Sequence, residues 1–141
     1  MSDSFAVEFK NVTKAFGDVQ AVRNLNFSIE KGQLVTLLGP SGCGKTTTLR
    51  LIAGLEMVTE GHIFIGDTEV TKISASDRDV SMVFQSYALF PHMTVMQNVS
   101  YGLTMSRISK QEVKEKSQTG LELVGLSGFG ERLPSELSGG Q

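Results

Sequence analysis

The eight residues 39–46, GPSGCGKT, constrain the fold of this chain more than any other stretch. They follow the pattern G-x-x-x-x-G-K-[ST], in which glycines let consecutive backbone N–H groups turn inward around a phosphate. Lys45 can reach the β- and γ-phosphates of a nucleotide, and the Thr46 hydroxyl can ligate Mg²⁺. The loop therefore predicts a nucleoside triphosphate site, but alone it does not separate an ATPase from a GTPase, a kinase or a helicase.

The segments on either side of this loop predict a strand and a helix. The apolar run LVTLLG (34–39) is typical of a strand buried on both faces, and KTTTLRLIAGL (45–55) is typical of a helix that ends near Gly54. A helix N-terminus after the loop favours an anion, because its unpaired N–H groups and the positive end of its dipole face the ligand. The apolar face of this helix is expected to consist of Leu49, Ile52 and Ala53.

Four further segments before residue 85 predict strands. They are FAVEFKNV (5–12), LNFSI (25–29), GHIFIG (61–66) and VSMVF (80–84). The order strand, glycine loop, helix, strand predicts an α/β fold with a largely parallel sheet.

The second half of the chain predicts helices. Thr94 is a candidate N-cap for a helix over 92–103. Ser109 and Glu112 have capping-box spacing at the start of 109–126, and Gly125 is the expected residue just past the end of that helix. The charged part of the helix, 109–118, is expected to face solvent.

Composition excludes several classes of function. Thirteen Lys and Arg against fifteen Asp and Glu give a formal net charge of −2, which offers no electrostatic reason to expect nucleic acid or an acidic membrane surface. No apolar run approaches the length of a membrane span, and the first residues lack the pattern of a signal peptide. The single cysteine, Cys43, excludes an internal disulfide and suits the cytoplasm. His62 and His92 lack metal-ligand spacing and are expected to be structural or surface residues.

The residues LSGGQ at 137–141, together with the phosphate loop, resemble one family closely: the nucleotide-binding subunits of ABC transporters. The segment 83–95 resembles the Q-loop of that family, and 12–22 resembles its A-loop. The sequence of residues 78–103 is most similar to that of importers of the sugar, polyamine and ferric-iron group. The resemblance implies a P-loop NTPase core with an N-terminal antiparallel β portion, followed by the start of a helical subdomain.

The resemblance also implies partners and a location. The chain would bind ATP and Mg²⁺ on the cytoplasmic face of a cell membrane. It would contact permease subunits and a second ATP-binding subunit in a head-to-tail dimer, and would act indirectly with an extracytoplasmic substrate-binding protein. Nucleic acid is not an expected partner.

Residue roles carry over from the family motif by motif. Phe16 would stack on adenine, although an isolated phenylalanine is more often a core residue. Gln85 would approach Mg²⁺ and the attacking water, and Cys43 would be partly accessible beside the phosphates. The triphosphate would be held by Gly39, Pro40, Ser41, Gly42, Cys43, Gly44, Lys45 and Thr46, with Thr47 near the α-phosphate, while Ser138, Gly139 and Gly140 would contact the γ-phosphate on the opposite subunit.

The family expects a Walker B aspartate, a catalytic glutamate and a switch histidine after LSGGQ, and residues 1–141 contain none of these segments. We therefore expect a truncated chain, with a nucleotide-binding core over 1–86 and a helical subdomain over 87–141, that binds ATP but lacks full hydrolytic machinery. The alternative is a non-catalytic nucleotide-binding or permease-docking module. A third interpretation is an ABC-type protein without a membrane partner. The importer-like sequence of the Q-loop argues against it.

Overall fold

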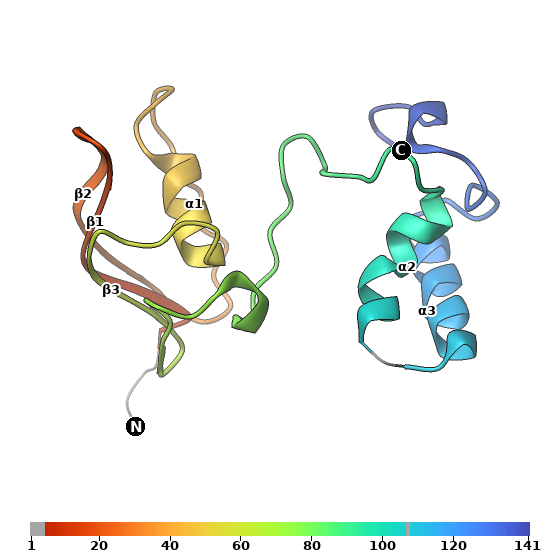
Figure 1. The fold of residues 1–141 in the computed structure, drawn as a ribbon, viewed down its shortest axis with the longest axis horizontal. Helices are drawn as coiled ribbons and strands as arrows, with labels where there is room; N and C mark the ends of the chain where they lie inside the picture. Colours follow the sequence, from red (N-terminus) through yellow and green to blue (C-terminus); the bar gives the residue numbers. More distant parts are fainter. Residues whose placement is uncertain (1–4, 107) are drawn as a thin grey trace. The chain divides into compact units, whose positions relative to one another are not determined.

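The structure, a computed structural model, describes residues 5–106 and 108–141. The chain forms two compact units, Met1–Met82 and Val83–Gln141, and each is considered by itself (Figure 1). The first unit contains the strands, one α-helix and a short 3-10 turn, and the second contains two α-helices and another short 3-10 turn. Gln85 falls in the second unit. The functional boundary after residue 86 stays a prediction.

A four-stranded antiparallel sheet organises the first unit. The strands are β1 (Val7–Phe16), β2 (Val19–Ile29), β3 (Glu60–Ile65) and β4 (Thr68–Glu69), in the order β2-β1-β3-β4. The turns at Gly17 and Gly66 are two residues long, and each glycine adopts φ of 57°. Turns this short can only join antiparallel neighbours. The predicted strands 5–12, 25–29 and 61–66 and the antiparallel N-terminal portion are confirmed.

The prediction of a largely parallel sheet is wrong for the described residues, where every strand pair is antiparallel. The segments 34–39 and 80–84, predicted as strands, form none. Leu34 and Leu38 are 98% and 95% exposed, and Val83 is 85% exposed. A strand exists only when a neighbour satisfies its backbone N–H and C=O groups, and no described residue pairs with either segment. An apolar run alone is therefore not sufficient to form a strand.

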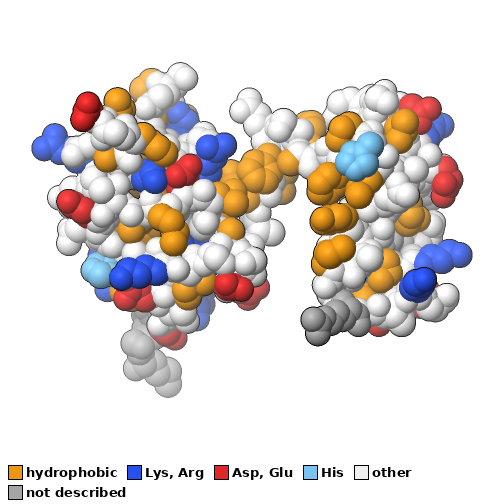
Figure 2. Space-filling model, viewed as in Figure 1, with side chains coloured by type: hydrophobic (Ala, Val, Ile, Leu, Met, Phe, Trp, Pro, Cys, Tyr) orange, Lys and Arg blue, Asp and Glu red, His pale blue; other side chains and the backbone are white. Residues whose placement is uncertain are grey.

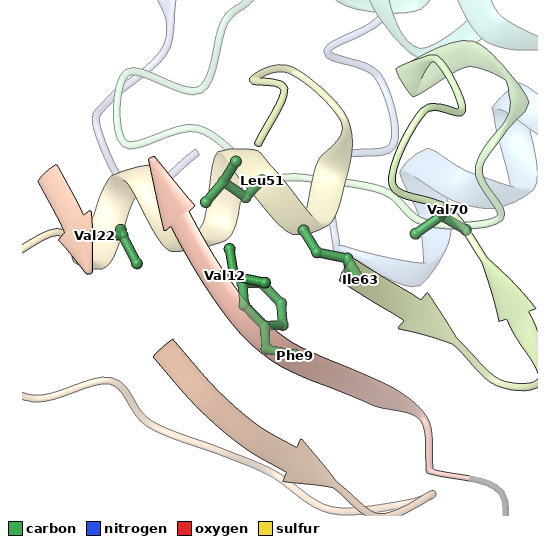
Figure 3. Close-up of a cluster of buried hydrophobic side chains, with 6 residues drawn as sticks. All are labelled: Phe9, Val12, Val22, Leu51, Ile63 and Val70. Atoms are coloured by element: carbon green, nitrogen blue, oxygen red, sulfur yellow. The ribbon is translucent and has the colours of Figure 1, made fainter. Parts of the chain in front are cut away.

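The core of the first unit lies between the sheet and helix α1 (Lys45–Ala53). Its buried members are Phe9, Val12, Val22, Leu51, Ile63 and Val70 (Figure 3). The rings of Phe9 and Phe27 stack with centroids 4.5 Å apart. Leu51 is fully buried, whereas Leu49 is 46% exposed, so the predicted apolar face of α1 is wrong at Leu49. The sheet contacts the face of α1 that carries Thr48 and Leu51 instead.

A buried arginine caps the C-terminal end of α1. The helix ends at Gly54 (φ 73°), as predicted. Nη1 of Arg78 donates to the carbonyls of Leu51 (2.6 Å) and Ile52 (2.9 Å), and Nε donates to the carbonyl of Ile73 (3.0 Å). Burial lowers the pKa of Arg78 from its ordinary value, but a guanidinium keeps its proton at neutral pH. A cation is favoured at this end of a helix, where the carbonyl dipoles point outward.

Two helices pack against each other in the second unit: α2 (Val95–Met105) and α3 (Lys110–Leu123). Thr94 caps α2 in a capping box with Gln97, as predicted for the N-cap. Ser109 accepts a hydrogen bond from the N–H of Glu112 (3.2 Å), which confirms it as the N-cap of α3. Gly125 adopts φ of 70° just past the end of α3, also as predicted.

The remaining short elements are η1 (Ala75–Asp77) in the first unit and η2 (Pro134–Glu136) in the second. Apolar side chains lie next to one another on the visible surface of the second unit (Figure 2). Its exposed apolar residues include Leu89, Val99, Leu123 and Val124. Among the described residues, no helix combines the length and apolar character needed to cross a membrane.

Candidate phosphate-binding site and its surroundings

The glycines of the loop before α1 have conformations that a side chain would disturb. Gly42 and Gly44 adopt φ of 80° and 92°, in the region that favours glycine. A Cβ atom on Gly44 would lie 2.5 Å from the carbonyl oxygen of Ala21 in β2. A Cβ on Gly39 would lie 2.7 Å from Sγ of Cys43. The loop is thus folded on itself and held against β2, with all of residues 39–43 exposed.

Lys45 directs its ammonium group back into this loop. Nζ donates to the carbonyl oxygens of Gly39 and Pro40, each at 2.7 Å, and lies 3.5 Å from Sγ of Cys43. An ammonium group has three donors, and all three point at loop atoms. A positive charge is therefore concentrated where the backbone of residues 39–44 turns.

The first turn of α1 presents free N–H groups beside this charge. Gly44 is the N-cap, no side chain accepts from the first-turn amides, and no acidic residue lies in the first turn. The hydroxyl of Thr48 donates to the carbonyl of Gly44 (3.0 Å) and fixes the start of the helix. Thr46 is exposed and Thr47 is half-buried. Unpaired amides, the positive dipole end and an ammonium group together make a site for a phosphate.

Cys43 is an exposed free thiol within this loop. It also lines a groove of about 390 Å³ together with Lys45 and apolar side chains that include Leu25 and Leu37. The expectation that Cys43 is accessible is therefore met, and the nearest charge to its sulfur in the loop is the Lys45 ammonium.

Phe16 is not a core residue, since it is 47% exposed. It ends β1 and pairs with Val19 across the hairpin. Ala21, whose carbonyl contacts Gly44, lies two residues further along β2, which is about 7 Å at the usual strand rise. The aromatic ring is thus carried by the hairpin end nearest the loop.

Gln85 is exposed and belongs to the segment that leads into α2. Tyr87 and Ala88 just after it adopt φ of 61° and 53°, uncommon values for residues with a side chain. Asn98 of α2 fixes the end of this segment by accepting from the N–H of Phe90 (2.9 Å) and donating to its carbonyl (3.1 Å).

Residues 138–141 form a compact turn. The N–H of Ser138 donates to Oε1 of Gln141 (2.9 Å), and the N–H of Gln141 donates to Oγ (3.4 Å) and the carbonyl (3.0 Å) of Ser138. These reciprocal bonds have the pattern of a capping box. Gly139 and Gly140 are exposed with open space around them. With Ser138, Tyr87 and Leu89 they line a cavity of about 420 Å³.

The family profile described as ABC transporter matches residues 22–141. The chain belongs to the ABC transporter family. A protein named Fe(3+) ions import ATP-binding protein FbpC from Brucella abortus (strain 2308) is 63% identical over 136 residues, which are 96% of this chain and 38% of that protein. The protein of the same name from Pasteurella multocida (strain Pm70) is 55% identical over all of this chain, which covers 40% of its length.

Solved ABC structures share the fold. One is the structure of a dimeric ATP-binding cassette in a post-hydrolysis state, bound to ADP and Pi. It matches this chain with a TM-score of 0.83 and 32% sequence identity. The match covers 96% of this chain and 64% of that chain. A dimeric bacterial ABC transporter cassette gives the same TM-score with 31% identity. The family and the α/β fold predicted from the motifs are thereby confirmed.

Within this ABC chain, the first unit brings together the loop residues 39–47 and the hairpin end that carries Phe16. The second unit holds Gln85 and the residues Ser138, Gly139 and Gly140. Sequence reasoning missed three polar residues that position these groups: Lys14, Arg78 and Asn98. Lys14 and Arg78 act through backbone carbonyls 43 and 27 residues away, and no local pattern predicts such a partner. Asn98 donates to nearer carbonyls, among them that of Phe90.

Proposed function

We propose that this chain is the nucleotide-binding part of an importer-type ABC transport ATPase subunit, in which ATP binding and hydrolysis drive substrate uptake. The observation that carries the proposal is the Lys45 ammonium 2.7 Å from two loop carbonyls, beside uncapped N–H groups of α1. The relatives are named as ATP-binding proteins for import of Fe(3+) ions, which supports ATP as the nucleotide and a ferric-ion importer as the parent assembly.

The residue roles follow from chemistry. Residues 39–44 and the amides of Lys45, Thr46 and Thr47 would surround the phosphates, and Lys45 would exchange its carbonyl partners for phosphate oxygens. Phe16, half exposed near the loop, would stack on adenine. Ser138, Gly139 and Gly140 would reach the γ-phosphate of a nucleotide bound by a second subunit, a role that the dimeric state of the solved relatives supports.

The family also implies Mg²⁺, and the available oxygen donors suit it. The Thr46 hydroxyl is exposed at the start of α1 and makes no hydrogen bond within residues 5–106 and 108–141, and Gln85 is exposed as well. Hydroxyl and amide oxygens are ligands that a hard cation accepts. Bound there, Mg²⁺ would neutralise charge on the β- and γ-phosphates.

Turnover would need more than these groups. Positioning and charge neutralisation by Lys45, Thr46 and Gln85 serve phosphoryl transfer, but a carboxylate that polarises the attacking water is also expected. We assign no carboxylate of residues 1–141 to that role, so we propose that these residues alone bind ATP with little or no hydrolysis. The chain spans 38% of the length of the Brucella relative.

The remaining partners are proposed from the importer assignment. The subunit would lie on the cytoplasmic face of the membrane, where it would contact permease subunits and act with an extracytoplasmic binding protein. The second unit carries an apolar groove of about 280 Å³ whose lining includes Leu89, Val99, Leu121 and Val124. An apolar, partly exposed groove is the kind of surface that binds a permease segment. The alternative, a permease-docking module without a nucleotide, would use this groove alone.

Titration calorimetry of Mg-ATP tests the proposal on the 141-residue chain and on Lys45→Ala. We expect measurable binding by the chain and its loss in Lys45→Ala. Lys31→Ala removes an exposed lysine from the turn after β2 and serves as the matched control, with affinity unchanged. Absence of binding by the unmutated, folded chain would leave only the docking alternative.

A further inference from the structure

Lys14 is a lysine with an unusually enclosed side chain, only 13% exposed, on β1 two residues before Phe16. Its Nζ donates to the carbonyl oxygen of Met57 (2.9 Å) and forms an ion pair with Oε2 of Glu56 (3.1 Å). The same atom lies 4.6 Å from the centroid of the Phe16 ring. One ammonium group therefore contacts a carbonyl, a carboxylate and an aromatic face at once.

The backbone on both sides of Lys14 is fixed to the segment that supplies these partners. The N–H of Ala15 donates to Oγ1 of Thr59 (2.9 Å), and the N–H of Thr59 donates to the carbonyl of Thr13 (2.8 Å). The segment after α1 thus runs along the end of β1. The position of the Lys14 ammonium is set by this framework and not by the rotamer preference of a free lysine.

The ammonium group restrains the Phe16 ring from one side. A cation over a ring is attracted to the negative face of the aromatic quadrupole, and a tightly held cation opposes ring rotation. Phe16 is nevertheless 47% exposed, so a large part of its surface stays available. A ring fixed before the ligand arrives loses less entropy when a base stacks on it.

We propose that Lys14 is a positioning residue for the nucleotide base: held by Glu56 and Met57, it fixes Phe16 from one face and leaves the other face to stack on adenine. This inference rests on the proposed ATP site. It predicts that Lys14 contributes to binding of the base and not to binding of the phosphates, because its ammonium group is already committed to three partners away from the loop.

A matched pair elsewhere in the same sheet separates this role from a general effect on the fold. Lys10, also on β1, lies 4.7 Å from the centroid of the Phe64 ring and 3.0 Å from a carboxylate oxygen of Glu8. It repeats the cation, ring and carboxylate of Lys14 at a ring that we assign no ligand. Lys10→Met therefore removes a cation–π contact and an ion pair from a more exposed lysine, whose side chain is 52% exposed, without touching the proposed base site.

The experiment compares Mg-ATP with inorganic tripolyphosphate, which has the phosphates but no base, by titration calorimetry. We expect Lys14→Met to weaken ATP binding about fivefold, the size of one cation–π contact, and to leave tripolyphosphate within about twofold. Lys14→Arg, which keeps a cation over the ring, is expected to restore most of the ATP affinity. Lys10→Met is expected to change neither ligand.

The other possible results of this experiment would contradict either the role of Lys14 or the proposed function. Equal weakening of both ligands in Lys14→Met, or unchanged ATP affinity, would overturn the role of Lys14 while the phosphate site stands. If Lys14→Met does not fold, Glu56→Gln tests the same role, because it removes the charge of the carboxylate that holds the Lys14 ammonium group. Glu56→Gln must then weaken ATP binding and leave tripolyphosphate binding unchanged. Failure of the unmutated, folded chain to bind either ligand would refute the proposed function itself, and the Lys14 role with it.

Discussion

Replacement of Arg78 by methionine tests how much the hydrogen bonds at the C-terminal end of α1 contribute to the stability of the fold. Arg78→Met removes three hydrogen bonds from a charged donor to the carbonyls of Leu51, Ile52 and Ile73. Such bonds contribute about 1.5–3 kcal/mol each, which gives a gross loss of roughly 5–9 kcal/mol. Methionine fills much of the same space and avoids desolvation of a guanidinium, which offsets several kcal/mol. In the variant, the Leu51 carbonyl would still accept a hydrogen bond from the N–H of Gly54 (3.3 Å).

We therefore expect Arg78→Met to lower the free energy of unfolding by about 2–3 kcal/mol. Urea denaturation followed by circular dichroism measures this value, and the melting temperature should fall by roughly 10–20 °C. Arg50→Met is the control, because Arg50 lies in the last turn of the same helix but is exposed. Its expected loss is below about 1 kcal/mol. A loss for Arg78→Met no larger than that of Arg50→Met would refute the reasoning.

Three further predictions concern single sites. Gly44→Ala would force a Cβ to 2.5 Å from a β2 carbonyl, so we expect a loss of about 1–3 kcal/mol in unfolding and of ATP binding, whereas Gly102→Ala in α2, with open space around it, should be neutral or stabilising in the same assays. Alkylation of Cys43, exposed beside the Lys45 ammonium, should block nucleotide binding and be slowed by Mg-ATP; equal labelling rates with and without nucleotide would contradict this placement. The hydrogen bond from His62 lowers the pKa of Glu69 below its ordinary 4.5. A depressed carboxyl pKa stabilises the fold above the unfolded pKa and loses that effect as pH falls through the folded one, so denaturation midpoints should fall on acidification below about pH 4.5 and less so in Glu69→Gln.

Local signals in the sequence predicted local structure well. The capping residues Thr94 and Ser109 and the left-handed Gly54 and Gly125 were predictable because each acts within one turn of its helix. The strands 5–12 and 25–29 were predictable because alternating polarity matches a half-buried sheet. The phosphate loop was predictable because its motif fixes backbone conformation directly, with Gly42 and Gly44 in the left-handed region.

Long-range polar contacts could not be predicted in this way. Arg78 reaches carbonyls 26 and 27 residues away, and Lys14 reaches a carbonyl 43 residues away. Nothing in the neighbouring sequence distinguishes these side chains from solvated charges such as Lys31. These side chains differ from Lys31 only in their surroundings in the folded chain. Lys14 lies where the segment after α1 packs along β1, and Arg78 lies beside the last carbonyls of α1.

The predictions that failed have a common physical cause. Leu34, Leu38 and Leu49 were expected to be buried and Val83 lies in a predicted strand, yet all four are exposed. An apolar side chain records a tendency to leave water, but it is buried only if another surface covers it, and a strand forms only if a neighbour pairs with it. Residues 34–39 and 80–84 pair with no strand among the described residues, and Leu34, Leu38 and Val83 stay exposed, whereas Leu51 and Val22 pack in the core beside the antiparallel sheet and are buried. The apolar pattern therefore specifies which residues require a partner, and the pairing of the strands decides which of them obtain one.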